Sequence, residues 1–120
     1  TKESDIYSFG VVLYEVLCGR FCVANYDDIR RFLPILAKKC HKENTLDTII
    51  HISLKEQISP NCLNRFSAIA YRCLQRDREE RPLMDEIVKE LEAALEYQVN
   101  SINLFHIINS HFLTNKNIII

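Results

Sequence analysis

The sequence predicts an all-α protein, and three observations carry this prediction. The 120 residues include only two glycines and three prolines, too few for the many tight turns of a β-protein. Two of the prolines stand at the start of long amphipathic stretches, where proline often begins a helix. Apolar residues recur at helical spacing in four stretches separated by polar connections.

The first expected helix covers residues 5–18 and is apolar on nearly every side, with Glu15 its one interior charge. Ser4 or Asp5 can cap its N-terminus, and Gly19 can end it. A helix without a polar face belongs inside a protein, so we expect polypeptide on all sides of it.

A second helix is expected over residues 26–39, with an apolar stripe of Ile29, Phe32, Leu33 and Leu36, followed by a polar loop at 41–44. The third helix begins after Ser59, with Pro60 in its first position. Its predicted buried stripe contains Leu63, Phe66, Ala70, Cys73 and Leu74. The fourth covers residues 81–98, with an inner face of Met84, Ile87, Val88, Leu91 and Leu95.

Residues 99–120 differ from the rest, because they are rich in Ile and Asn and carry one formal charge. They show no steady period and no cap signal, so we expect an irregular, poorly ordered tail, with a short helix or strand as the alternative. Its last residues, 117–120, are an aggregation hazard if exposed. The predicted organisation is therefore one domain portion over 1–98 and a separate tail over 99–120.

The composition excludes several classes of partner. The net charge is −1 and basic residues are interspersed with acidic ones, so no nucleic-acid partner is expected. No run of about 18 apolar residues occurs, so no membrane-spanning segment is expected. The five cysteines form no C-x-x-C pair and indicate reduced thiols; Cys40 beside His41 has poor spacing for zinc. The first residues lack Met and an apolar signal region, and suggest the interior of a longer chain.

Two motifs carry a family resemblance. Residues 4–15 read SDIYSFGVVLYE, and residues 73–84 read CLQRDREERPLM. They resemble, in the same order, the αF segment and the αH–αI connection of eukaryotic protein kinases, and most closely those of plant receptor-like kinases. The resemblance covers residues 1–98. It implies part of a kinase C-lobe, with helices corresponding to αF, αG, αH and αI.

The resemblance also assigns roles to four residues. Asp5 corresponds to the aspartate that anchors the catalytic loop, and the alternative is a plain N-cap. Val12 and Val16 correspond to supports of the catalytic spine, which is compatible with simple core packing. Arg81 corresponds to the partner of the A-P-E glutamate, which would precede Thr1. Without that glutamate, Arg81 is expected to be solvated or to pair with a nearby acid: Asp77, Glu79 or Glu80.

The sequence departs from the family in two places. Leu83 stands where the family often has Thr or Ser, so the capping box with Glu86 is broken. The tail after Gln98 matches no family segment, and we hypothesise that it is translated noncoding sequence such as a retained intron. Transcript sequencing that placed the tail in a normally spliced exon would count against this hypothesis.

The motifs of phosphoryl transfer are missing from this sequence. It has no Gly-rich loop, H-R-D or D-F-G, and its four histidines stand outside any such pattern. We therefore expect no catalytic, cofactor-binding or metal-binding residue and no activity of this chain alone. By resemblance, the intact parent would use ATP and Mg²⁺ to phosphorylate Ser or Thr, and also Tyr, at the cytoplasmic side of the plasma membrane.

Two other readings remain open. Residues 26–40 correspond to a region that often faces substrates and regulators, so the chain could be a non-catalytic binding module or decoy. It could also be a truncated gene product with no function. In either case the first helix lacks much of its covering, so we expect a marginally stable, aggregation-prone helical bundle.

Overall fold

The computed structural model describes residues 3–19 and 26–113, and within these ranges every regular element is helical. The helices are α1 (Glu3–Cys18), α2 (Tyr26–Glu43), α3 (Ile52–Lys55), α4 (Pro60–Cys73) and α5 (Met84–Leu113), with short 3-10 helices η2 (Leu46–Thr48) and η3 (Arg78–Glu80). The prediction of an all-α fold is confirmed. Cys22 and residues 117–120, which entered the predictions above, lie outside the described residues.

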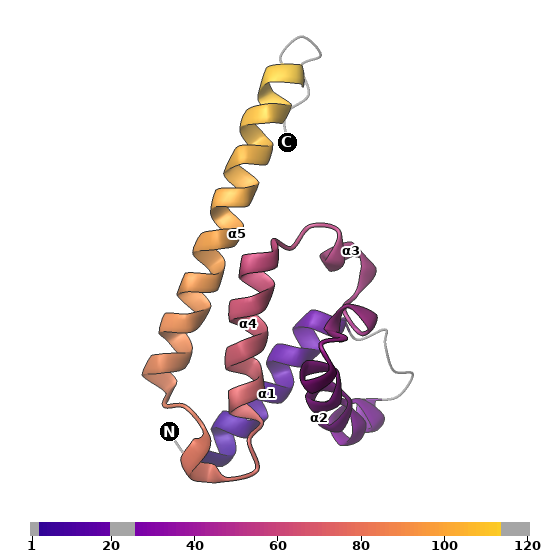
Figure 1. The fold of residues 1–120 in the computed structure, drawn as a ribbon, viewed down its shortest axis with the longest axis vertical. Coiled ribbons are helices and arrows are strands. Elements are labelled where there is room, and N and C mark those ends of the chain that lie inside the picture. The colour runs from indigo at the N-terminus through magenta and orange to yellow at the C-terminus, as the bar shows by residue number, and fades with distance from the viewer. Residues whose placement is uncertain (1–2, 20–25, 114–120) are drawn as a thin grey trace.

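Helix α4 is the central element, because α1, α2 and α5 all pack against it. Figure 1 shows α5 running alongside α4, while α1 crosses behind it. The predicted start of α4 is confirmed: the Ser59 hydroxyl accepts a hydrogen bond from the backbone N–H of Cys62 at 3.1 Å, and Pro60 is the first helical residue.

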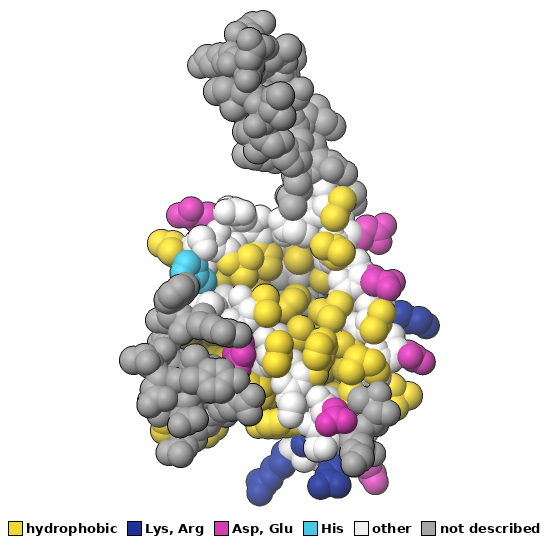
Figure 2. Space-filling view, turned by 180° about the vertical axis from the view of Figure 1, so that it is seen from behind, with side chains coloured by type: hydrophobic (Ala, Val, Ile, Leu, Met, Phe, Trp, Pro, Cys, Tyr) yellow, Lys and Arg dark blue, Asp and Glu magenta, His cyan; other side chains and the backbone are white. Residues whose placement is uncertain are grey.

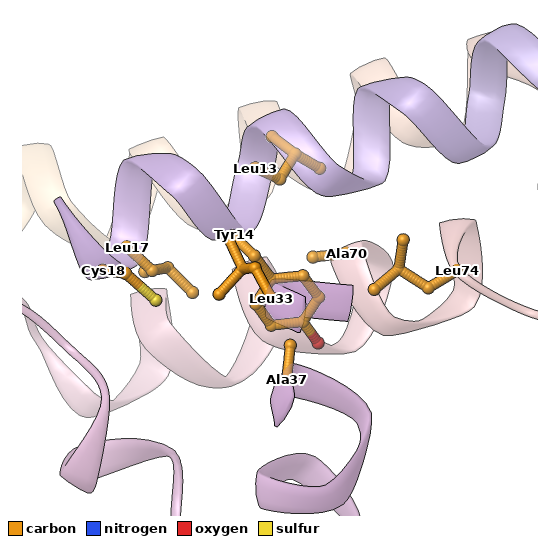
Figure 3. Packing of buried hydrophobic residues seen from close by; sticks show 8 residues of the cluster. All are labelled: Leu13, Tyr14, Leu17, Cys18, Leu33, Ala37, Ala70 and Leu74. Atoms are coloured by element: carbon orange, nitrogen blue, oxygen red, sulfur yellow. The ribbon is translucent and has the colours of Figure 1, made fainter. Parts of the chain in front are cut away.

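The core lies between α1, α2 and α4. Figure 3 shows its eight buried members, and the Tyr14 ring lies among side chains from all three helices. Leu33 and Ala37 reach it from α2, and Ala70 reaches it from α4. A second, smaller cluster joins α1 to α5 through α4: Ile6, Ile69, Cys73 and Ile87.

Gly10 sets the distance between α1 and α4. A Cβ atom placed on Gly10 would lie 2.7 Å from the Cβ of Cys73 and 3.0 Å from a methyl carbon of Leu74. Two non-bonded carbon atoms cannot come this close without steric overlap. The two helices can therefore pack together here only because residue 10 has no side chain.

Several predicted boundaries and faces are wrong. Helix α1 begins at Glu3, so Ser4 and Asp5 lie inside its first turn and do not cap it. Residues 41–43 belong to α2, which ends before Asn44, a residue in the left-handed region with φ 58°. Helix α5 continues past Gln98 to Leu113, so the predicted irregular tail is helical over 99–113.

The predicted apolar stripes are only partly buried. On α2, Leu33 is buried but Phe32 and Leu36 are exposed, and the side chain of Ile29 lies outside the description. On α5, Ile87 is buried while Val88 and Leu95 are exposed. Helical spacing identified the side of each helix that faces the core, but these helices carry more apolar surface than the core of this chain covers.

Tyr14 carries an unusual polar group in the core. Its side chain is fully buried, and its hydroxyl is the one buried side-chain polar atom among the described residues that has no hydrogen-bond partner. Burial also raises the pKa of this phenol, so the hydroxyl stays neutral. A buried hydroxyl without a partner costs about 1–3 kcal/mol of desolvation free energy.

We expect Tyr14→Phe to raise the free energy of unfolding by about 1 kcal/mol, because the change removes the unpaired hydroxyl and keeps the ring. Urea denaturation followed by circular dichroism measures this difference. Tyr71→Phe is the matched control, since the Tyr71 ring is only partly buried and stacks on His41. A loss of stability in Tyr14→Phe would contradict the assignment of an unpaired hydroxyl.

No helix among the described residues is long and apolar enough to cross a lipid bilayer. The four described cysteines, Cys18, Cys40, Cys62 and Cys73, are buried, and none of them forms a disulfide with another. Burial raises the pKa of the Cys73 thiol to about 11, so this thiol is protonated at neutral pH. Within the described ranges, no three metal-ligating side chains come together.

Candidate functional site

Three of the residues singled out in the sequence share one side of α1. Asp5, Val12 and Val16 are spaced by seven and four residues, which is about two turns and one turn of an α-helix. All three side chains are exposed, Val12 at 47% and Val16 at 59%. The opposite side of the helix carries its buried residues, including Leu13 and Leu17.

The exposed valines belong to a larger apolar surface. Figure 2 views the molecule from behind, where hydrophobic side chains spread across the centre of the face. Exposed valines and leucines come from α1 and α5: Val12, Val16, Val88 and Leu95. Contiguous apolar surface of this kind marks a place where other polypeptide packs. Val12 and Val16 are therefore exposed on one side of α1, and the expectation that further polypeptide covers this side stays a prediction.

A groove of about 450 Å³ opens beside Val16. Its walls come from four helices, through Leu17 of α1, Leu54 of α3, Phe66 of α4 and Leu91 of α5. Its lining is almost entirely apolar and can accommodate apolar side chains. Its titratable group is the Cys62 thiol, whose pKa is raised by burial.

Gln98 holds the rim of this groove. Its side-chain oxygen accepts a hydrogen bond from the Ser59 backbone N–H at 2.9 Å, and its amide nitrogen donates to the Gln57 carbonyl at 3.0 Å. The two bonds join α5 to the connection that precedes α4, so the groove keeps its shape where α5 leaves the bundle.

Arg81 lies at the other end of α1, and its guanidinium has fixed contacts. Its Nε donates to the Gln75 carbonyl at 2.7 Å, and its Cζ lies 5.0 Å from the centroid of the Tyr7 ring, a cation–π distance. The residue is partly exposed and lines a second cavity of about 390 Å³ together with Ile6, Glu79 and Met84. That Arg81 is solvated or pairs with Asp77, Glu79 or Glu80 stays a prediction.

Leu83 and Glu86 show the consequence of the broken capping box. Leu83 is 78% exposed directly before α5. The Glu86 carboxylate instead accepts two hydrogen bonds from the Arg72 guanidinium, at 2.6 and 3.1 Å. These bonds lower the pKa of Glu86, and the pair links α5 to α4 at the surface.

Sequence reasoning missed two residues that shape the site. The missing side chain of Gly10 positions α1 on α4. The ring of Tyr14 lies among side chains from three helices. The pattern Gly-x-x-x-Tyr gave no signal for either role, because both depend on which helix packs opposite.

Helix α1 thus presents the Asp5 carboxylate and two exposed valines on one side, next to an apolar groove. Comparison with known proteins gives the class: residues 1–91 match the family described as protein tyrosine and serine/threonine kinase. The chain belongs to the protein kinase family and corresponds to the C-terminal part of the kinase domain.

Its relatives include receptor-like protein kinases of Arabidopsis thaliana. It is 40% identical to ANXUR2 over 99 residues, 37% identical to FERONIA over 108 residues and 40% identical to HERK 1 over 101 residues. Each match covers 82% of this chain but only 11–12% of the relative. The chain thus spans about an eighth of the relatives that it matches.

Proposed function

We propose that this chain is the C-terminal part of a receptor-like protein kinase that transfers the γ-phosphate of ATP to Ser and Thr hydroxyls, and also to Tyr. One observation carries the proposal: Asp5, Val12 and Val16 lie together on the uncovered side of α1. These are the positions that the family resemblance assigns to anchoring the catalytic loop and supporting the catalytic spine. An exposed face made of those residues is expected if the rest of the kinase domain packs against this side of α1.

In this proposal the chain is scaffold and takes no direct part in the chemistry. The cradle for the ATP phosphates, the catalytic base and the ligands of Mg²⁺ belong to motifs that this sequence does not contain. The chain alone therefore binds no nucleotide and transfers no phosphate. The parent would act on the cytoplasmic side of the plasma membrane, in keeping with the receptor-like relatives.

Nucleotide binding and reconstitution test the proposal together. We expect ATP with Mg²⁺ to leave the melting temperature of this chain unchanged, whereas ligand at about 100 times its Kd would stabilise a binding protein by about 2.7 kcal/mol. Joining the preceding part of the ANXUR2 kinase domain to Thr1 should give a chimera that binds ATP and phosphorylates a protein substrate.

The chimera also tests the α1 face. Val12→Asp combined with Val16→Asp should lower its phosphotransfer rate about tenfold or more, because two buried apolar contacts are lost. Ile52→Asp is the matched control, because Ile52 is a 68% exposed apolar residue on α3 that does not belong to the apolar surface of α1 and α5. An ATP-dependent rise in the melting temperature of the chain alone, or a chimera indifferent to the α1 substitutions, would contradict the proposal.

A second candidate function is a non-catalytic binding module, and exposed apolar residues on α2 favour it. Phe32, Ile35 and Leu36 are 53%, 67% and 42% exposed within the segment 26–40. Such residues suit a protein partner. The test is a pull-down with the wild type and with a double variant that combines Phe32→Ser and Ile35→Ser. If both capture the same partner, this face is excluded as the binding site.

A further inference from the structure

Helix α5 has a second apolar side next to the one that it buries. Ile87 and Ala94 are buried, and each is followed directly by an exposed residue, Val88 or Leu95. Leu91 is partly buried and lies between these two, three residues after Val88 and four before Leu95. Residues three and four apart share one side of a helix, so Val88, Leu91 and Leu95 form one apolar row.

The sequence continues this spacing along the rest of the helix. The positions that follow Leu95 at alternating steps of three and four residues are Gln98, Ile102, Phe105, Asn109 and Phe112. Three of them are large apolar residues. An apolar repeat of about 3.5 residues, sustained over several heptads, is typical of a helix that pairs with another helix. We call Val88, Leu91, Leu95, Ile102, Phe105 and Phe112 the α5 stripe.

The second half of the α5 stripe is not explained by the bundle or by the kinase family. Figure 1 shows the end of α5 extending past the ends of the other helices. The family match ends at residue 91, before this part of the helix begins. An apolar repeat on a projecting helix is favourable only when other polypeptide covers it.

Charge distinguishes the two ways in which two copies of α5 can pair. Residues 84–98 carry five carboxylates and one lysine, whereas residues 99–113 contain no Asp, Glu, Lys or Arg. Arginines of α4 pair with two of the carboxylates, Glu86 and Glu90, so three of the five remain. Parallel pairing would place two acidic halves side by side, and like charges repel. Antiparallel pairing places the acidic half of each helix beside the uncharged half of the other.

We propose that two copies of this chain pair through α5, antiparallel and related by a two-fold axis near the middle of the helix. Gln98 lies at this middle, 14 residues after Met84 and 15 before Leu113. The part of the α5 stripe after Gln98 in each copy then covers the part before Gln98 in the other. Both copies use the same surface, so the contact is closed and assembly stops at a dimer.

The apolar groove lies where the second copy would pack. Leu91 and Leu95 form part of its α5 wall, and its volume is about 450 Å³. An aromatic side chain buries about 150–250 Å², and a stable interface buries about 1,200–2,000 Å² in total. Phe105 and Phe112 of two copies would therefore supply about half of the area that a stable dimer needs.

Sedimentation equilibrium of the 120-residue chain at a series of concentrations tests the dimer. We expect a reversible transition from the mass of one chain, 14.1 kDa, to twice that mass. Ile102→Asp should weaken the association about tenfold or more, because each dimer would then bury two carboxylates in an apolar contact. A chain that stays monomeric, or forms only species larger than a dimer, would overturn the proposal. Either result would leave the kinase assignment untouched, because the family match does not include residue 102.

Ile107→Asp is the matched control. It makes the same change on the same helix, but about 140° around the helix axis from residue 102. It should change the association by less than about threefold, in line with the small effect of substitutions outside a contact. Equal losses in Ile102→Asp and Ile107→Asp would overturn the α5 stripe as the interface.

A mixture of two variants tests the orientation. Leu95→Lys changes the stripe before Gln98 and Ile102→Asp changes it after Gln98, so antiparallel pairing brings the introduced lysine of one copy close to the introduced aspartate of the other. Each variant alone should be weakened, and the mixture should associate at least about tenfold more tightly than either. A mixture that associates no more tightly than its components would overturn the antiparallel arrangement.

Discussion

Leu17→Ala should lower the free energy of unfolding by about 2–5 kcal/mol, the range found when a buried leucine is truncated. Leu17 is 1% exposed and belongs to the cluster that joins α1, α2 and α4. It also lines the apolar groove, so its removal would leave a cavity that neighbouring side chains only partly fill. Urea denaturation followed by circular dichroism measures the change.

The adjacent residue supplies the control. Val16 is 59% exposed on the other side of α1, so Val16→Ala should change the free energy of unfolding by no more than about 0.5 kcal/mol in this chain. In the chimera with the preceding kinase segment, the same substitution should cost more, because the valine is then covered. Similar losses for both alanine variants of this chain would refute the division of α1 into a buried and an uncovered side.

Gly10→Ala should lower the free energy of unfolding by about 1–3 kcal/mol, even though alanine favours an isolated helix by about 1 kcal/mol. The new Cβ would lie 2.7 Å from the Cβ of Cys73, which the α4 backbone holds in place. The clash is relieved only if α1 and α4 move apart, and this loosens every contact between them. Steric overlap therefore outweighs helix propensity at this position.

Ser8→Ala is the matched control for Gly10→Ala. Ser8 is exposed on the same helix, and its hydroxyl donates only to the Ser4 carbonyl at 3.1 Å, so its replacement should be neutral or slightly stabilising. Thermal melts of the two variants separate the effects. A Gly10→Ala protein as stable as the wild type would show that α1 and α4 are not in close contact at this residue.

Local signals in the sequence located the elements better than they located the surfaces. Ser59 and Pro60 predicted the start of α4 correctly, because a capping hydroxyl and a proline act within one turn. The end of α2 was missed although Asn44 carried the signal, since asparagine tolerates the left-handed conformation that closes a helix. The predicted end of α5 was too early because the steady apolar period stops near Gln98. The helix continues because residues 99–113 contain no glycine or proline to stop it.

The candidate site was only partly predictable from the sequence. The family motif singled out Asp5, Val12 and Val16, and their spacing places them on one side of α1. That this side is exposed depends on how the other helices pack around α1, and no residue within the helix encodes it. The approach of Lys38 and Arg81 to the Tyr7 ring was missed for a related reason: the three residues are far apart in the sequence, and only the tertiary fold brings them together.

The position of Gln98 has a consequence for how this molecule comes apart. Up to this residue, α5 is tied to α4 and to the turn before it, and it should unfold together with them. Figure 1 shows the remainder of α5 rising past the ends of the other helices. A helix that extends beyond its neighbours depends more on its own backbone hydrogen bonds, which barely sustain an isolated helix of this length in water. The distal part of α5 can therefore melt and re-form while the bundle below it stays folded.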